Sequence, residues 1–135
     1  MVDDNRMGLV ARQAVLEELG YRITALTAPA EALELAAREK FDLIITDYKM
    51  PVMDGIEFIR RVRKHAPAAP IIIISGFVDA YGLTEQTTGA DMVIAKSANE
   101  VAHMVRGVKS LLRRPPQRKP ASSHPPVPKA RRQKA

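Results

Sequence analysis

The sequence has 135 residues, 46% of them apolar and 4% aromatic, which predicts one domain with an aliphatic core and a short tail. It has no cysteine for disulfides or thiolate metal sites, no apolar run of the roughly 20 residues that cross a bilayer and no signal peptide, so we expect a cytoplasmic protein. The net charge of +6 comes from the chain end: Arg113 onward holds eight of the 21 bases and none of the 15 acids, leaving residues 1–112 at −2.

The first part of the chain predicts a helix, a strand and a second helix. The first helix is expected between Asn5, as its N-cap, and Gly20, as the residue that ends it. Its apolar stripe recurs every four residues: Met7, Ala11, Val15 and Leu19. The alternating segment Tyr21–Ala25 predicts a strand. Pro29 favours the first turn of the second helix, whose apolar residues are Ala30, Leu33 and Ala37.

The later part of the chain continues the alternation. Strands are predicted at Asp42–Thr46, Pro70–Ile74 and Met92–Ala95, and the isoleucine-rich runs are typical of strands buried on both faces. A third helix carries the stripe Ile56, Ile59 and Val62. Residues 78–89 predict only a marginal, mobile helix, because glycine and threonine are poor helix formers. The last helix is apolar at Val101, Met104, Val105, Val108, Leu111 and Leu112, and Ser97 and Glu100 precede it with capping-box spacing.

Alternating strands and helices with short connections predict a parallel sheet covered by helices on both faces. In such sheets ligands bind at the carboxyl ends of the strands. Here those ends carry polar residues, namely Asp3 and Asp4 after Val2, then Asp47, Ser75 and Lys96.

The types of these residues indicate phosphoryl chemistry. Three carboxylates at one edge would raise one another's pKa values unless a cation joined them, and all-oxygen ligands favour Mg²⁺. An opposing hydroxyl and ammonium would position and neutralise a transferring phosphoryl group. Each residue alone is more often a turn former, a helix cap or a solvated charge. Four strand ends that all carry residues suited to phosphoryl chemistry favour a functional site.

These residues match a known pattern. Asp3-Asp4-Asn5, the segment from Asp47 to Gly55 (DYKMPVMDG), Ser75 and Lys96 resemble the receiver domain of bacterial two-component response regulators. The resemblance implies a flavodoxin-like α/β fold, a doubly wound, parallel five-stranded sheet of order 2-1-3-4-5. It covers Val2 to about Leu112, so we expect a receiver domain over residues 1–113 and a tail over 114–135.

The resemblance also implies roles for the site residues. Asp47 is the expected phosphoryl acceptor, phosphorylated by a sensor histidine kinase or a histidine phosphotransfer protein. Asp4, Asp47 and the backbone carbonyl of Lys49 are expected to hold Mg²⁺, with Asp3 binding it through water. Ser75 and Lys96 are expected to contact the phosphoryl group. The chain would be a signalling domain rather than an enzyme, limited to self-phosphorylation and autodephosphorylation.

Three departures from the family pattern bear on the output. Val93 stands where the family usually has an aromatic switch residue, and Ser97 stands where a proline usually follows the lysine. The first strand is truncated to Met1 and Val2. We therefore expect the native start to lie upstream of Met1, which an intact mass of 14.9 kDa for the native protein would contradict.

Two functions follow as alternatives. The first is a stand-alone receiver that binds a downstream output protein when phosphorylated. The second is a degenerate receiver that acts as a constitutive interaction module. An aspartyl-phosphate phosphatase is disfavoured, because Lys49 stands where that chemistry needs a second carboxylate.

The tail is rich in proline, serine and basic residues and is expected to be disordered. A solvated tail is favoured over contact with an anionic partner, because no aromatic residues interleave the bases. The tail is also too short for a helix-turn-helix module, so DNA binding is not supported.

Overall fold

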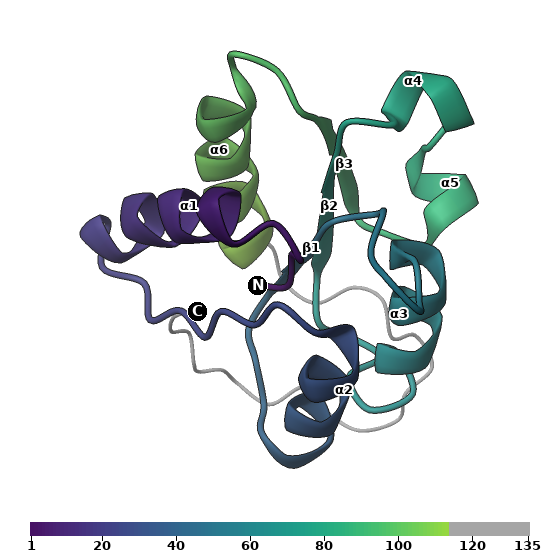
Figure 1. Cartoon of the computed structure of the whole chain (residues 1–135). Helices are drawn as coiled ribbons and strands as arrows, with labels where there is room; N and C mark the ends of the chain where they lie inside the picture. The colour runs from purple at the N-terminus through teal and green to yellow at the C-terminus, as the bar shows by residue number, and fades with distance from the viewer. Residues whose placement is uncertain (114–135) are drawn as a thin grey trace.

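The computed structural model describes residues 1–113 of the chain. In these residues three parallel strands alternate with helices (Figure 1). The strands are β1 (Ile44–Thr46), β2 (Ile71–Ser75) and β3 (Met92–Ala95). The helices are α1 (Arg6–Glu18), α2 (Pro29–Arg38), α3 (Gly55–Val62), α4 (Val78–Tyr81), α5 (Glu85–Thr88) and α6 (Glu100–Arg113). The predicted tail, residues 114–135, lies outside the described residues.

The sheet has the order β1-β2-β3, and Val2 extends it beyond β1. Val2 forms parallel bridges to Thr46 on one side and to Leu26 on the other. The arrangement Leu26, Val2, β1, β2, β3 follows the predicted order 2-1-3-4-5, although its first two members are single bridges rather than strands. The predicted strand Tyr21–Ala25 is wrong, because this segment faces a partner too short to form a ladder.

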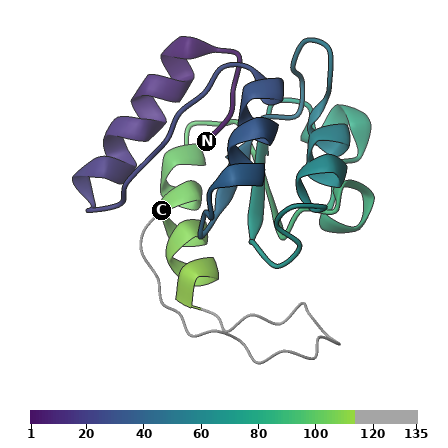
Figure 2. The same ribbon diagram turned by 90° about the horizontal axis from the view of Figure 1, so that it is seen from below.

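Two apolar layers enclose the sheet, with α1 and α6 on one face and α2 and α3 on the other (Figures 1 and 2). Strand β2 supplies both layers, because successive side chains point to opposite faces. Ile71 and Ile73 pack towards α3, whereas Ile72 and Ile74 pack towards α6. All four are at most 1% exposed, so the prediction of doubly buried strands is confirmed for β2.

The helices α1 and α2 exist as predicted, but each turns a different face to the core. Helix α1 buries Leu9, Arg12 and Leu16, whereas Met7 and Leu19 are 81% and 46% exposed. A repeat of four drifts by about 40° per step on a helix of 3.6 residues per turn, so the predicted stripe spreads over several faces. Helix α2 likewise buries Pro29 and Ala32, with Ala30 and Ala37 exposed.

The start of α6 and the segment before β3 also differ from the predictions. Residues 78–89 form two short helices, because Gly82 adopts a left-handed conformation (φ 61°) and Thr84 caps a new helix. The predicted capping box at α6 is wrong. The Ser97 hydroxyl accepts from the backbone N–H of Asn99, and the Glu100 carboxylate binds Arg12 instead. None of the helices within residues 1–113 has the length and apolar character that a membrane crossing requires.

Candidate phosphoryl-acceptor and metal site

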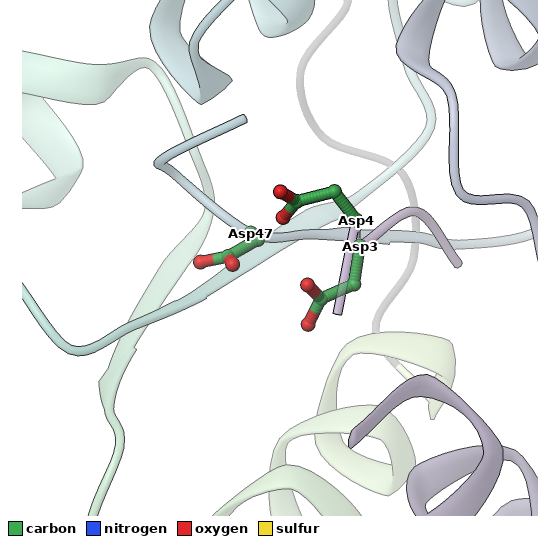
Figure 3. Close-up of side chains that lie close together, drawn as sticks. All are labelled: Asp3, Asp4 and Asp47. Carbon is green, nitrogen blue, oxygen red and sulfur yellow. The ribbon is translucent and has the colours of Figure 1, made fainter. Parts of the chain in front are cut away.

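Three carboxylates meet at the carboxyl ends of Val2 and β1 (Figure 3). Ligand oxygens of Asp3, Asp4 and Asp47 all lie within 4.8 Å of one another. Asp3 and Asp47 are buried, at 2% and 7% exposure, whereas Asp4 is exposed. The predicted acid cluster therefore exists, and it opens to solvent on the side of Asp4.

Backbone pairing brings these residues together. The Val2 N–H donates to the Ile45 carbonyl (2.8 Å), and the Asp47 N–H donates to the Val2 carbonyl (3.0 Å). These bonds fix the register of Val2 against β1, so the residues that follow each segment share one edge. Asn5 then caps α1 by accepting from the Gly8 N–H, which turns the chain away immediately after the acid pair.

Lys96 lies opposite the acids, as predicted. Its ammonium is 3.3 Å from Asp47 Oδ2 and 3.8 Å from Asp3 Oδ2. The Lys96 N–H donates to the Ser75 carbonyl (2.9 Å), which places the ends of β2 and β3 side by side. Ser75 is fully buried, and its hydroxyl accepts from the Phe77 N–H (2.9 Å).

Val93 and Ser97 are the two positions near the site that depart from the family pattern. Val93 is half-buried in β3, and its N–H donates to the Glu85 carboxylate of α5 (3.2 Å). The peptide bond between Lys96 and Ser97 is trans, as are all the others among the described residues.

The loop after Asp47 leaves no room for a side chain at Gly55. A Cβ atom there would lie 2.6 Å from the Asp47 carbonyl oxygen and 2.9 Å from Tyr48 Cα. The close approach is stabilised by a hydrogen bond from the Gly55 N–H to the Tyr48 carbonyl (2.6 Å). Within this loop Val52 is fully exposed and has a left-handed φ of 74°, which is strained for a β-branched residue.

The Lys49 side chain lies over an aromatic ring. Its ammonium lies 5.3 Å from the centre of the Phe77 ring. Phe77 stacks on Tyr81 with ring centres 5.4 Å apart, and Tyr81 also contacts Tyr48 at 5.6 Å. The sequence analysis missed this aromatic cluster, because Tyr48 lies in the loop after β1 whereas Phe77 and Tyr81 belong to the distant α4 segment.

Arg12 is a further site residue that the sequence analysis missed. Its guanidinium binds Asp3 Oδ2 and, at 2.8 Å, Glu100 Oε2. The one signal in the sequence is Gly8, which lies one helical turn before Arg12 and leaves space for a large side chain. Neither residue by itself predicts that the arginine points inward.

The electrostatics of the cluster favour a bound cation. Burial and the neighbouring Asp3 charge raise the pKa of Asp47 from 3.8 to about 6, although Lys96 and the Tyr48 N–H act in the opposite direction. A divalent ion between the carboxylates would remove this repulsion. The donors are all oxygen atoms, which suits Mg²⁺. The residues present therefore fit the predicted metal.

Comparison with known proteins decides the family. The model of the response regulator receiver domain matches residues 1–106. The chain belongs to the response regulator receiver family. The chain therefore has the flavodoxin-like receiver fold and is a signalling domain of two-component systems.

Relatives and solved structures agree with this assignment. The receiver domain is 43% identical over 75 residues to the response regulator receiver protein CpdR of Brucella abortus (strain 2308), covering 56% of this chain and 62% of CpdR. It is 32% identical over 77 residues to the transcriptional regulatory protein ZraR of Klebsiella oxytoca, covering 57% of this chain and 17% of ZraR. The matched region thus spans less than two thirds of the length of these relatives.

Two similar structures contain Mg²⁺. The response regulator TrrA of Thermotoga maritima, in complex with Mg²⁺ and BeF, has 30% identity and a TM-score of 0.73, covering 82% of this chain and 94% of TrrA. The receiver domain of sensor histidine kinase PA1611 from Pseudomonas aeruginosa PAO1 has 26% identity and the same TM-score, covering 82% and 92%. It holds a magnesium ion in its active-site cleft.

Proposed function

We propose that this chain is a cytoplasmic, stand-alone receiver that accepts a phosphoryl group on Asp47 from a sensor histidine kinase or a histidine phosphotransfer protein. The observation that carries the proposal is the position of Asp47. Its buried carboxylate lies within 4.8 Å of two other acids and 3.3 Å from the Lys96 ammonium. The 43% identity to CpdR, which is named a response regulator receiver protein, supports the receiver role.

In this proposal Mg²⁺ is held by Asp4, Asp47 and the backbone carbonyl of Lys49, with Asp3 binding through water. The hydrogen bonds of Asp3 support its indirect role. Its Oδ1 accepts from the Asn5 N–H (2.9 Å), and its Oδ2 binds Arg12 and faces Lys96. With protein donors on both oxygens, Asp3 is better placed to orient a water molecule than to bind the ion directly.

The transfer forms one bond and breaks one. A carboxylate oxygen of Asp47 attacks the phosphorus atom, the N–P bond of the donor phosphohistidine breaks, and the imidazole leaves with the electron pair of that bond. A bound cation would neutralise part of the negative charge in this step. Lys96 pairs with the phosphoryl group, and the Ser75 hydroxyl turns towards it. Since Ser75 accepts from the Phe77 N–H, movement of this hydroxyl would shift the start of α4.

The output in this proposal is phosphorylation-dependent binding of a partner protein. The surface offered is a shallow groove between the edge strand β3 and helix α6, whose lining includes Val93, Ile94, His103, Arg106 and Gly107. Glu85 attaches α5 to β3 beside Val93, so displacement of the α4–α5 segment would reach this groove. The autocatalytic activity proposed is limited to self-phosphorylation and autodephosphorylation.

The test is incubation of the protein with acetyl phosphate and Mg²⁺, followed by intact-mass measurement. We expect a gain of one phosphoryl group that requires Mg²⁺ and is lost in Asp47→Asn. Asp54→Asn is the matched control, because Asp54 lies in the same loop and asparagine preserves its role as the N-cap of α3. This control should still be phosphorylated.

The second candidate, a constitutive interaction module, is favoured by one observation. Val93 has neither a ring nor a hydroxyl that could follow movement of Ser75. Under this alternative the wild-type protein gains no phosphoryl group, or gains one without any change in the amide NMR signals of β3 and α6. Phosphorylation accompanied by shifts at those residues would exclude it.

A further inference from the structure

A buried guanidinium lies beside the acid cluster. Arg12 is 6% exposed on the inner face of α1, between Leu9 and Leu16. It binds Asp3 of the cluster through one terminal nitrogen and Glu100 at the start of α6 through the other. The arginine therefore joins the acid cluster, α1 and α6 through two ion pairs.

The space for this guanidinium is provided by Gly8. A Cβ atom at that position would lie 3.2 Å from one terminal nitrogen of Arg12 and 3.4 Å from the other. An aliphatic side chain at position 12 would continue the apolar stripe between Leu9 and Leu16 without the cost of desolvating a charge. The core does not need a cation here, so the reason for its presence lies in the cluster that it contacts.

The charges around Asp3 define the effect of Arg12. Asp3 Oδ2 already faces the Lys96 ammonium at 3.8 Å, and Arg12 adds a second positive charge to the same oxygen. Both cations offset the charges of Asp3, Asp4 and Asp47. A divalent ion entering the cluster meets less negative charge than three carboxylates alone would provide, and it is repelled by the guanidinium.

We propose that Arg12 is a positioning residue that acts as an internal counter-cation of Asp3 and weakens Mg²⁺ binding at the cluster, with Glu100 holding the guanidinium in place. The proposal rests on the part of the proposed function in which Mg²⁺ binds at the acid cluster. It does not require phosphorylation of Asp47. Its consequence is a site whose cation affinity depends on contacts made by the first turn of α6.

The test is a titration of the unphosphorylated full-length chain with MgCl₂, followed by calorimetry and by amide NMR shifts. Arg12→Gln should bind Mg²⁺ about tenfold more tightly than wild type, the factor expected for removing one unit charge near a divalent ion in a water-like dielectric. Arg12→Lys keeps the charge and should remain close to wild type. Arg63→Gln is the matched control, since Arg63 is a partly buried arginine paired with Asp91 rather than with the acid cluster.

Glu100→Gln tests the same guanidinium from its other side. Loss of the Glu100 charge leaves the positive charge of Arg12 less compensated, so Mg²⁺ binding should weaken by a few fold. A purely structural role for the two ion pairs predicts a lower melting temperature in both variants with no opposite shifts in affinity. If Arg12→Gln does not fold, as judged by circular dichroism, the Glu100→Gln titration decides the question.

Unchanged or weaker Mg²⁺ binding in folded Arg12→Gln overturns the proposal, and so does unchanged or tighter binding in Glu100→Gln. Absence of Mg²⁺ binding in both wild type and Arg12→Gln also overturns it. The phosphoryl-acceptor function fails by a different result, the lack of a mass gain with acetyl phosphate. A protein that shows the affinity shifts but no phosphorylation would retain the role of Arg12 and lose the function proposed for Asp47.

Discussion

Replacement of Asp47 by asparagine should stabilise the domain at neutral pH when Mg²⁺ is absent. The pKa of Asp47 is raised from 3.8 to about 6 by burial and by the charge of Asp3. A carboxyl group whose pKa is raised on folding contributes stability that is fully present below pH 3.8 and is lost as the pH rises through 6. At pH 7.5 the ionised carboxylate therefore costs stability, and Asp47→Asn removes that cost.

The size of the effect follows from the pKa difference. A shift of about two pKa units corresponds to about 3 kcal/mol at 1.36 kcal/mol per unit. The cluster opens to solvent beside the exposed Asp4, so screening reduces this figure. We expect Asp47→Asn to raise the free energy of unfolding by about 1–2 kcal/mol at pH 7.5, and by roughly half as much at pH 5.

The assay is urea unfolding followed by circular dichroism, with a metal chelator present, at pH 7.5 and at pH 5. Glu34→Gln, which removes an exposed carboxylate on α2, is the control and should change stability little at either pH. Added Mg²⁺ should stabilise wild type more than Asp47→Asn, because the variant lacks a charged ligand. If Asp47→Asn is no more stable than wild type at pH 7.5 in chelator, the electrostatic account of the cluster is wrong.

Four further outcomes are expected. Gly55→Ala should destabilise the domain by about 2–3 kcal/mol in urea unfolding and slow phosphorylation, because its Cβ would meet the Asp47 carbonyl oxygen at 2.6 Å; a neutral effect would show that the loop shifts easily. Val52→Gly should raise the free energy of unfolding by about 1 kcal/mol, since it relieves a φ of 74° at a fully exposed position, and a loss of stability would contradict this. Asn5→Ala should cost about 1 kcal/mol through loss of the α1 cap, read from the same curves, whereas Asn5→Ser should cost little. Mg²⁺ affinity measured by calorimetry should fall as the pH drops below 6, because the proton on Asp47 competes with the ion, and a flat profile from pH 7 to pH 5 would refute that coupling.

Much of the architecture follows from local patterns in the sequence. The isoleucine runs predict β1 and β2 because continuous β-branched residues are typical of strands buried on both faces. Asn5 and Gly20 predict the ends of α1 because each meets a local backbone requirement, a cap for unpaired N–H groups and a left-handed φ of 100°. Such requirements involve residues close together in the chain, so the sequence displays them directly.

Two predictions made from local patterns failed because of distant parts of the chain. The segment Tyr21–Ala25 alternates as a strand does, but a strand also needs a ladder partner of similar length, and Val2 offers a single bridge. Ser97 and Glu100 have the spacing of a capping box, but Glu100 forms an ion pair with Arg12, 88 positions earlier in the chain. In the first case the tertiary partner was too short, and in the second a tertiary contact replaced the local one.

For the acid cluster, too, one part could be predicted from the sequence and another part depended on tertiary contacts. The sequence by itself determined that Asp3, Asp4, Asp47, Ser75 and Lys96 follow successive strand segments, and the geometry of parallel sheets requires such residues to share an edge. Only the tertiary structure decided how the negative charges of the cluster are compensated. The raised pKa of Asp47 and the pairing of Asp3 with Arg12 arise from burial and from contacts between elements. Spacing along the chain does not encode these quantities, because they depend on which charges meet once solvent is excluded.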